Sequence, residues 1–155
     1  MRKSFTVIEL VMVMVIIGVL SVISMPVIIT SYSSIKIDGA YKQLKQDIRY
    51  AQQLAVSRQV VHGIYLDPSA DSYFVYRLNT SNIVKDPSTQ KPLNVIYGQG
   101  KFSGVDMVST TFNIPANNTL EFNSLGAPSC AGTITLRYGS ITKTVDVEQN
   151  TGRIQ

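Results

Sequence analysis

Apolar residues are distributed unevenly along the chain, and the longest run lies near the N-terminus. Residues 10–29 are almost wholly apolar and contain no charged side chain. In a helix, twenty such residues span about 30 Å, the thickness of the hydrocarbon core of a bilayer. A cleavable secretory signal has a shorter apolar stretch and a small-residue cleavage site, which does not follow here. The pattern predicts a transmembrane helix with Arg2 and Lys3 on its cytoplasmic side.

A second pattern begins after Ile29, where apolar residues recur at steps of three and four. This spacing marks one face of an amphipathic helix. The residues on that face are Ile37, Tyr41, Leu44, Ile48, Ala51 and Ala55, and those off it include Lys42, Lys45, Asp47, Arg49 and Gln52. We predict one long helix from about residue 6 to 58, half in the membrane and half under a folded domain, with Gly39 loosening it locally.

Beyond Arg58 the period shortens to two, and β-branched and aromatic residues become frequent. The segment NIVKDPSTQKPL is interpreted as a polar, proline-punctuated loop, and Gly139-Ser140 as a two-residue type II′ hairpin turn. The expected fold class is α+β, with an antiparallel sheet packed on the exposed half of the helix. The predicted strands are Val60–Leu66, Ser72–Leu78, Asn94–Tyr97, Val105–Asn113, Thr119–Asn123, Thr133–Tyr138 and Thr142–Glu148.

Composition argues against most enzyme classes. The chain has one cysteine, Cys130, and one histidine, His62, which leaves little material for a Cys/His metal site or a nucleophilic triad. No glycine-rich phosphate-binding motif occurs. The formal charge is +4 and includes Arg2 and Lys3 at the N-terminus, so the rest is too weakly basic to argue for nucleic acid. We expect no catalytic role, no cofactor and no metal.

Five residues of the predicted head allow two interpretations. His62 is expected to be structural or on the surface, and Cys130 a lone thiol, with an intermolecular disulfide as the alternative. Asp67, Asp71 and Asp86 lie at turn signals, where aspartate bends and caps chains. A calcium site is the alternative there, because oxygen ligands cluster in such loops.

Glu9 conflicts with the apolar run that it adjoins. An ionised carboxylate in hydrocarbon costs about 2–4 kcal/mol or more, and the segment contains no cation to offset it. The nearest cations are Arg2 and Lys3; a cut before Phe5 would create another, the new α-amino group. A partner from another copy or subunit would make Glu9 half of a shared ion pair that sets registration, and the alternative is a carboxylate that snorkels to the membrane interface.

The stretch KSFTVIEL (Lys3–Leu10) resembles the type III prepilin signal of type IV pilins and type II secretion pseudopilins. The resemblance implies that a prepilin peptidase cuts after Ser4 and methylates the new N-terminal amine of Phe5. Ser4 departs from the family's usual glycine but is also small. Glu9 is then the fifth mature residue, which in this family pairs with the N-terminal amine of a neighbouring subunit.

Pro26 matches the proline that bends the transmembrane helix of this family. Physically, a proline removes one backbone hydrogen bond, and the nearby small residues Gly18, Ser21 and Ser24 ease packing around the bend. The alternative is a membrane helix that simply ends near Pro26.

Three further segments resemble the GspH/FimT group: DIRYAQQLAVSRQ (Asp47–Gln59), FNSLGAP (Phe122–Pro128) and VEQNTGRIQ (Val147–Gln155). Together with the leader, they imply a single-pass protein of the bacterial inner membrane with a periplasmic head. The implied divisions are a leader at 1–4, a transmembrane helix at 5–30, an amphipathic stem at 31–58 and a β-rich head at 59–155.

The resemblance implies a structural subunit, specifically a minor pseudopilin of a type II protein secretion system. The alternatives are a minor pilin that primes type IV pilus assembly and a DNA-binding minor pilin in DNA uptake. The implied partners are the prepilin peptidase, other pilin or pseudopilin subunits, and an inner-membrane assembly platform with its cytoplasmic ATPase. For the DNA-binding alternative, the candidate phosphate contacts are Arg137, Lys143 and Arg153, with a steep salt dependence expected. Otherwise these three residues are a solvated, charged sheet edge.

Overall fold

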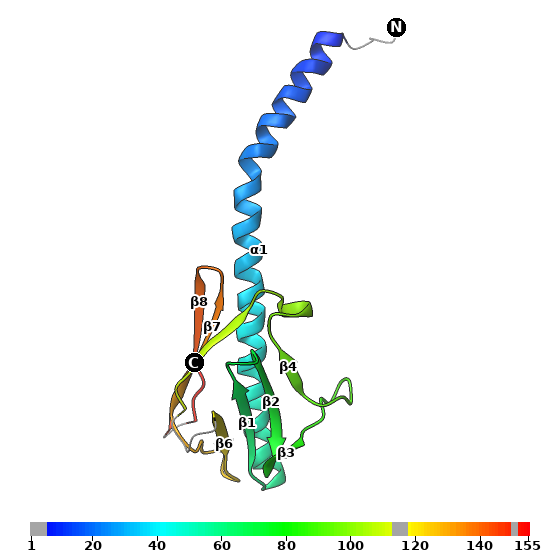
Figure 1. Ribbon diagram of the computed structural model, residues 1–155. Helices are drawn as coiled ribbons and strands as arrows, with labels where there is room; N and C mark the ends of the chain where they lie inside the picture. The colour runs from blue at the N-terminus through cyan, green and yellow to red at the C-terminus, as the bar shows by residue number, and fades with distance from the viewer. Residues whose placement is uncertain (1–5, 113–117, 150–151) are drawn as a thin grey trace.

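The computed structural model describes residues 6–112, 118–149 and 152–155, with side chains outside residues 23–31. Its main element is one helix, α1 (Val7–Arg58), which confirms the long helix predicted from residue 6 to 58. Figure 1 shows the first half of α1 extending away from the strands and the second half packed against them. Among the residues that the structure describes, no helix has the combined length and hydropathy that crossing a membrane requires.

The predicted apolar face of α1 is confirmed as the face that the head covers. Five of its six residues are fully buried, and Tyr41 is half-buried against the core. α1 continues without interruption at Gly39, so the loosening predicted there is absent. All described buried apolar residues lie between Ile37 and Ile154. A fragment of residues 32–155 therefore retains the described core. The five buried residues are Ile37, Leu44, Ile48, Ala51 and Ala55.

The described residues contain eight strands in two antiparallel sheets, and their packing with α1 confirms the expected α+β fold class. The first has the order β3-β2-β1-β6, with β4 also pairing with β2, and the second has the order β5-β7-β8. The strands of the first sheet are β1 (His62–Asp67), β2 (Ser72–Arg77), β3 (Asn79–Ile83), β4 (Asn94–Ile96) and β6 (Thr119–Phe122). Those of the second are β5 (Asp106–Thr110), β7 (Gly132–Tyr138) and β8 (Ile141–Val147).

Each of the seven predicted strands is present, with bounds that shift by one or two residues. The exception is the end of β5, which lies at Thr110, whereas its predicted end, Asn113, is outside the described residues. Strand β3 and a short 3-10 helix, η1 (Gly100–Phe102), were not predicted. β3 is exposed along its whole length, so it carries no apolar alternation that a sequence pattern could reveal.

The hairpin predicted between the last two strands is confirmed. Tyr138 of β7 pairs with Ile141 of β8, which leaves Gly139 and Ser140 as a two-residue loop. Gly139 has φ +57°, and Ser140 is not left-handed. A positive φ at the first loop residue alone is typical of a type II′ turn and not of type I′.

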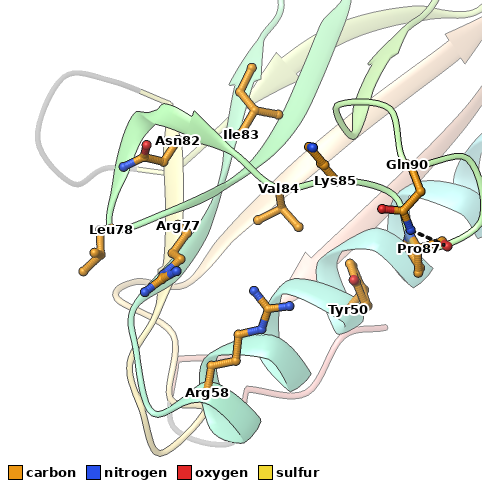
Figure 2. A pocket seen from close by; sticks show the side chains of 10 residues that line it. All are labelled: Tyr50, Arg58, Arg77, Leu78, Asn82, Ile83, Val84, Lys85, Pro87 and Gln90. Carbon is orange, nitrogen blue, oxygen red and sulfur yellow. Dashed lines mark hydrogen bonds between the residues drawn. The ribbon is translucent and has the colours of Figure 1, made fainter.

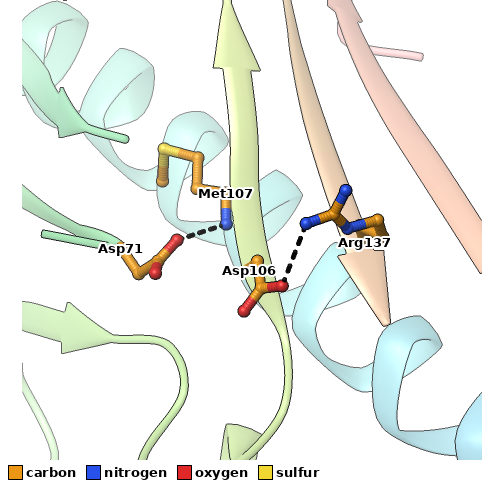
Figure 3. A network of polar contacts seen from close by, with 4 residues as sticks. All are labelled: Asp71, Asp106, Met107 and Arg137. Carbon is orange, nitrogen blue, oxygen red and sulfur yellow. Dashed lines mark hydrogen bonds and ion pairs between the residues drawn. The ribbon is translucent and has the colours of Figure 1, made fainter. Parts of the chain in front are cut away.

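Asp71, in the turn between β1 and β2, links the two sheets (Figure 3). Its Oδ1 accepts a hydrogen bond from the backbone N–H of Met107 in β5 at 2.7 Å, and its carbonyl accepts one from Tyr97 at 2.7 Å. Asp71 has φ +48°, in the left-handed region that aspartate tolerates better than most residues. The Asp71 side chain therefore both suits the left-handed turn and supplies the hydrogen-bond acceptor for Met107.

Asp71→Ala is expected to destabilise the head by about 2 kcal/mol. The substitution leaves the buried N–H of Met107 without its acceptor, and alanine is disfavoured at a positive φ. Asp71→Asn is the matched control, because asparagine keeps both the acceptor oxygen and the left-handed tolerance. Urea unfolding of residues 32–155 measures the difference. Equal losses in the two variants would show that the linkage does not depend on the acceptor.

Candidate functional site

From Val7 to Val22, the exposed surface of α1 is almost wholly apolar. Large apolar side chains point outward on every side of the helix, and none of them is covered by the head. A contiguous apolar surface of this size marks a protein-protein or membrane contact. The exposed residues are Val7, Ile8, Leu10, Val11, Met12, Val13, Met14, Val15, Ile16, Ile17, Val19, Leu20 and Val22.

Glu9 is the one carboxylate on this surface, and it lies in the first turn of α1. Its backbone N–H donates to the carbonyl of Thr6 at 3.1 Å. A carboxylate is favoured there, because the N-terminal end of a helix carries a partial positive charge. Among the described residues, no Lys or Arg lies within ion-pair distance of Glu9. The candidate partners Arg2 and Lys3 lie outside the described residues.

The structure describes only some of the other residues predicted to act in processing and assembly. Ser4 and Phe5, the predicted cleavage and methylation site, lie outside the described residues. The backbone of α1 is helical through Pro26, whose side chain is among those not described. The alternative of a helix ending near Pro26 is therefore wrong. Ser21 Oγ donates to the carbonyl of Ile17 at 2.7 Å, a bond that satisfies a serine inside an apolar helix.

The stem and the head are joined by a group of polar contacts. Lys143 Nζ on β8 lies 2.8 Å from Asp38 Oδ1 on α1. The Lys143 hydrogen bond lowers the pKa of Asp38, and Asp38 in turn raises the pKa of Lys143. Lys36 donates to the carbonyl of Ser103 at 3.2 Å, and its ammonium lies over the ring of Tyr138. These half-exposed contacts orient the β7–β8 hairpin more than they stabilise it.

The structure does not bring Arg137, Lys143 and Arg153 together into one basic patch. Lys143 lies opposite the buried Leu136, so it faces α1, whereas Arg137 points to the other face and pairs with Asp106 at 3.4 Å (Figure 3). Arg153 instead lines a cavity of about 480 Å³ beside α1. The other basic residues of that cavity are Lys45 and Arg49.

A second cavity, of about 720 Å³, lies where α1, β2 and the segment after β3 meet (Figure 2). Three basic side chains line it: Arg58 from the last turn of α1, Arg77 from the end of β2, and Lys85. No sequence motif joins these three residues, which are far apart in the chain. The sheet pairing of β2 and its contact with the end of α1 assemble the group.

Asp47, expected on the outer face of α1, is instead half-buried at the edge of the core. Its Oδ2 accepts a hydrogen bond from the hydroxyl of Tyr73 at 2.8 Å. Burial raises the pKa of the Asp47 carboxyl above its usual range, although the Tyr73 hydrogen bond acts in the opposite direction. The Tyr97 ring lies against Tyr73, with its hydroxyl buried. The group forms a polar contact between α1 and the first sheet.

Asp47→Asn is expected to raise the melting temperature of residues 32–155 at pH 7. The folded-state pKa of Asp47 lies above its ordinary value of 3.8, so its ionised form reduces stability at neutral pH. This cost disappears as the pH falls through the folded-state pKa toward 3.8. Asparagine never ionises and still accepts from Tyr73, so its advantage should shrink between pH 7 and pH 4. A constant advantage across that range would contradict this explanation.

The remaining polar candidates have structural surroundings. His62 is buried, and one ring nitrogen lies 2.8 Å from the Val60 carbonyl. Burial lowers the pKa of His62, as do the charges of Arg58 and Arg77. Cys130 is a buried free thiol. Asp67 and Asp86 each bind a serine two residues later and the local backbone.

The structure gives no support to a calcium site. Within the described ranges, no three His, Cys, Asp or Glu side chains gather as metal ligands. The carboxylate oxygens of Asp67, Asp71 and Asp86 instead accept hydrogen bonds inside their own turns or across the sheets. Asp67 and Asp86 have the turn role that the turn signals predicted, whereas the Asp71 side chain accepts from Met107 in the other sheet.

Comparisons with known proteins give one family. The model of the family described as type II transport protein GspH matches residues 40–151. The comparison with curated protein sequences found no match. The minor pseudopilin EpsH from the type 2 secretion system of Vibrio cholerae has 13% identity and a TM-score of 0.57, over 76% of this chain and 93% of that one. The type IV minor pilin FimU of Pseudomonas aeruginosa has 16% identity and a TM-score of 0.54, over 76% of this chain and 85% of that one.

The two kinds of comparison support different statements. The solved structures share the fold, since their identities are too low to carry more. The family match covers the second half of α1 and most of the head. Proteins of this family are pilin-like subunits and not enzymes, which agrees with a surface built for contact. The chain belongs to the GspH family, described as type II transport proteins, and it has the fold of a minor pseudopilin or minor pilin.

Proposed function

We propose that the protein is a minor pseudopilin, a structural subunit of the filament of a type II secretion system. The observation that carries this proposal is the match of residues 40–151 to the GspH family, behind an exposed apolar stem. The stem offers subunit contacts, and the β-rich head meets neighbouring heads or cargo. The protein contributes shape and contacts and catalyses nothing.

The proposal places the chain in the inner membrane before assembly. Residues 5–30 form a single-pass transmembrane helix with a cytoplasmic N-terminus, and the head at 59–155 is periplasmic. The apolar surface of α1 from Val7 to Val22 supports this placement, because it suits lipid and the packed interior of a helical bundle equally well. Transfer of the stem from lipid to the helical bundle then costs little free energy. A small cost suits a subunit that moves from the membrane into a filament.

Processing and assembly follow from the N-terminal sequence. The prepilin peptidase removes residues 1–4 after Ser4 and methylates Phe5. Glu9 then pairs with the N-terminal amine of Phe5 in a neighbouring subunit, and the bend at Pro26 shapes the stem for packing. Glu9 supports this role because no described cation of its own chain satisfies it. An inner-membrane platform and its ATPase supply the work of assembly.

A minor pilin that primes type IV pilus assembly is the second candidate. It is supported by the structural similarity to FimU, which is close to that with EpsH. The nucleic-acid alternative draws less support, because Arg137 and Lys143 each pair with a carboxylate. A phosphate chain that binds Arg137 and Lys143 would have to displace both of these carboxylates.

A clean in-frame deletion tests the proposed function. The deletion strain is scored in parallel for secreted proteins in the medium and for pili sheared from the surface, with the wild-type gene restored as the control. Loss of secretion with intact pili is the expected result. Loss of pili with normal secretion would make the protein a pilus-priming minor pilin. If both processes survive, the proposed function is wrong and DNA uptake becomes the next assay.

A further inference from the structure

We propose that the cavity lined by Arg58, Arg77 and Lys85 is a docking site for an acidic peptide segment of a neighbouring filament subunit. It is called the distal basic cavity below. The identity of the occupant rests on the proposed function, because that function supplies the neighbouring subunit. The existence of the cavity and its charge do not depend on that function, because they follow from the structure of the head.

The charge of the cavity is unbalanced. Arg58, Arg77 and Lys85 line it together, and no carboxylate is part of the lining. Among the described residues, none of the three lies within ion-pair distance of an Asp or Glu. Asp86, next to Lys85 in the sequence, is held in its own turn by Ser88, whose N–H and Oγ bind Asp86 Oδ1 at 2.7 and 2.6 Å. Like charges gathered without a counterion raise the local potential and attract an anion.

The donors of the cavity suit carboxylates. Figure 2 shows the guanidinium groups of Arg58 and Arg77 extending into the same space, between the end of α1 and the β2–β3 turn. A guanidinium binds a carboxylate through two parallel hydrogen bonds. Asn82 adds an amide group to the wall, whereas the Nε2 of Gln90 donates to the carbonyl of Pro87 at 3.1 Å. At about 720 Å³ the cavity has room for several side chains and not only for a single ion.

An exposed apolar rim distinguishes a peptide from a nucleic acid as the occupant. Leu78 and Ile83 line the cavity and are 57% and 39% exposed. Leu78 also has φ +64°, an unusual conformation for a leucine, held where its N–H donates to the carbonyl of Val61 at 3.0 Å. Apolar side chains beside arginines are typical of protein interfaces. A nucleic-acid groove would instead carry a longer stripe of cations with stacking aromatic rings.

The position of the cavity suits a contact between subunits. Arg58 ends α1, so the cavity lies at the end of the head farthest from the N-terminus of the stem (Figure 1). In a filament with parallel stems, this end faces the subunit next along the axis. A lipid headgroup cannot occupy it, because the length of the head separates it from the stem that enters the membrane.

The test uses the full chain in detergent micelles and a fluorescent hexaglutamate peptide as the probe. Saturable binding of hexaglutamate is expected, and Arg58→Gln/Arg77→Gln should weaken it about tenfold or more. Arg137→Gln is the matched control, since it removes one cation that already pairs with Asp106, and it should leave binding unchanged. The double variant should melt no lower than the wild type, because the substitutions relieve a repulsion and break no ion pair.

Three results would overturn the proposal. They are absence of saturable hexaglutamate binding, equal weakening by the Arg137→Gln control, and stronger binding of a hexathymidine strand than of hexaglutamate. The last result would make the cavity a nucleic-acid site. Because the binding assay needs no filament, its failure is separate from that of the proposed function. The wild-type protein could bind hexaglutamate while the deletion strain keeps normal secretion and normal pili. In that case the cavity would still be an acidic-peptide site, but its partner would not be a filament subunit.

Discussion

Replacement of Glu9 by alanine or valine is expected to leave the protein inserted and processed but to reduce its incorporation into filaments about tenfold or more. Removing a carboxylate makes the apolar segment easier to insert, so membrane levels should not fall. Incorporation should fall because the N-terminal amine of a neighbouring Phe5 would be left buried without its counter-charge. The same substitution is therefore expected to favour membrane insertion and to reduce incorporation into filaments.

The measurement compares the amount of each variant in membranes with the amount in sheared or cross-linked filaments. Glu9→Gln is an informative third variant, because it keeps hydrogen bonding and removes only the charge. It should assemble less well than the wild type. Val11→Ala is the control for altered apolar contact, since Val11 is exposed on the same helix and carries no charge. Normal incorporation of either Glu9→Ala or Glu9→Val would contradict the assembly role.

Gly63→Ala is expected to destabilise the head by about 1–3 kcal/mol. Gly63 lies in β1 beneath the ring of Tyr76, a β2 residue that crosses over it to donate a hydrogen bond to Glu121 of β6 at 2.8 Å. A Cβ at Gly63 would lie 2.6 Å from the Tyr76 ring and 3.0 Å from the Leu120 carbonyl. The ring cannot move aside without losing its bond to Glu121, which ties β2 to β6 across β1.

Gly39→Ala is the matched control, because the same methyl group has room there. Its Cβ would lie 3.9 Å from the nearest atom outside the helix, on Phe102, and the position is inside α1. Alanine is the better helix former by about 0.5–1 kcal/mol, so this variant should be more stable than the wild type. Urea unfolding of residues 32–155 measures both. A loss of stability in Gly39→Ala equal to that in Gly63→Ala would contradict the steric explanation.

Local periodicity was enough to predict much of this fold. The step of three and four residues placed Ile48 and Ala55 on the buried face of α1, and both are fully buried. The alternation near the C-terminus placed the β7–β8 hairpin and its turn at Gly139. These features are local, because each depends on residues within a few positions of one another.

The features that the sequence did not reveal depend on distant residues. Asp47 looks like a surface residue of a helix, and only the approach of Tyr73 buries it. The division into two sheets depends on which strands pair, and β3 has no apolar face to indicate pairing. The distal basic cavity likewise requires Arg58 and Arg77 to meet through the fold. Pairing and register are long-range properties that single-sequence periodicity does not contain.

The functional residues divide in the same way. Glu9 and Phe5 were selected by a motif of fixed spacing, which a sequence carries completely. Arg137, Lys143 and Arg153 were grouped by charge alone, and the structure separates them onto different surfaces. Charge identifies candidates, and only the fold determines which of them share a face.

The central claim is that this chain is processed like a pilin and then assembles through its stem. The most direct measurement is the intact mass of the protein extracted from the membranes of its native host, followed by fragmentation of its N-terminus. We predict a mature chain that lacks residues 1–4 and begins with N-methylated Phe5. Retention of the MRKS leader in the wild-type protein would contradict the claim, because Glu9 would then have no processed N-terminus to meet.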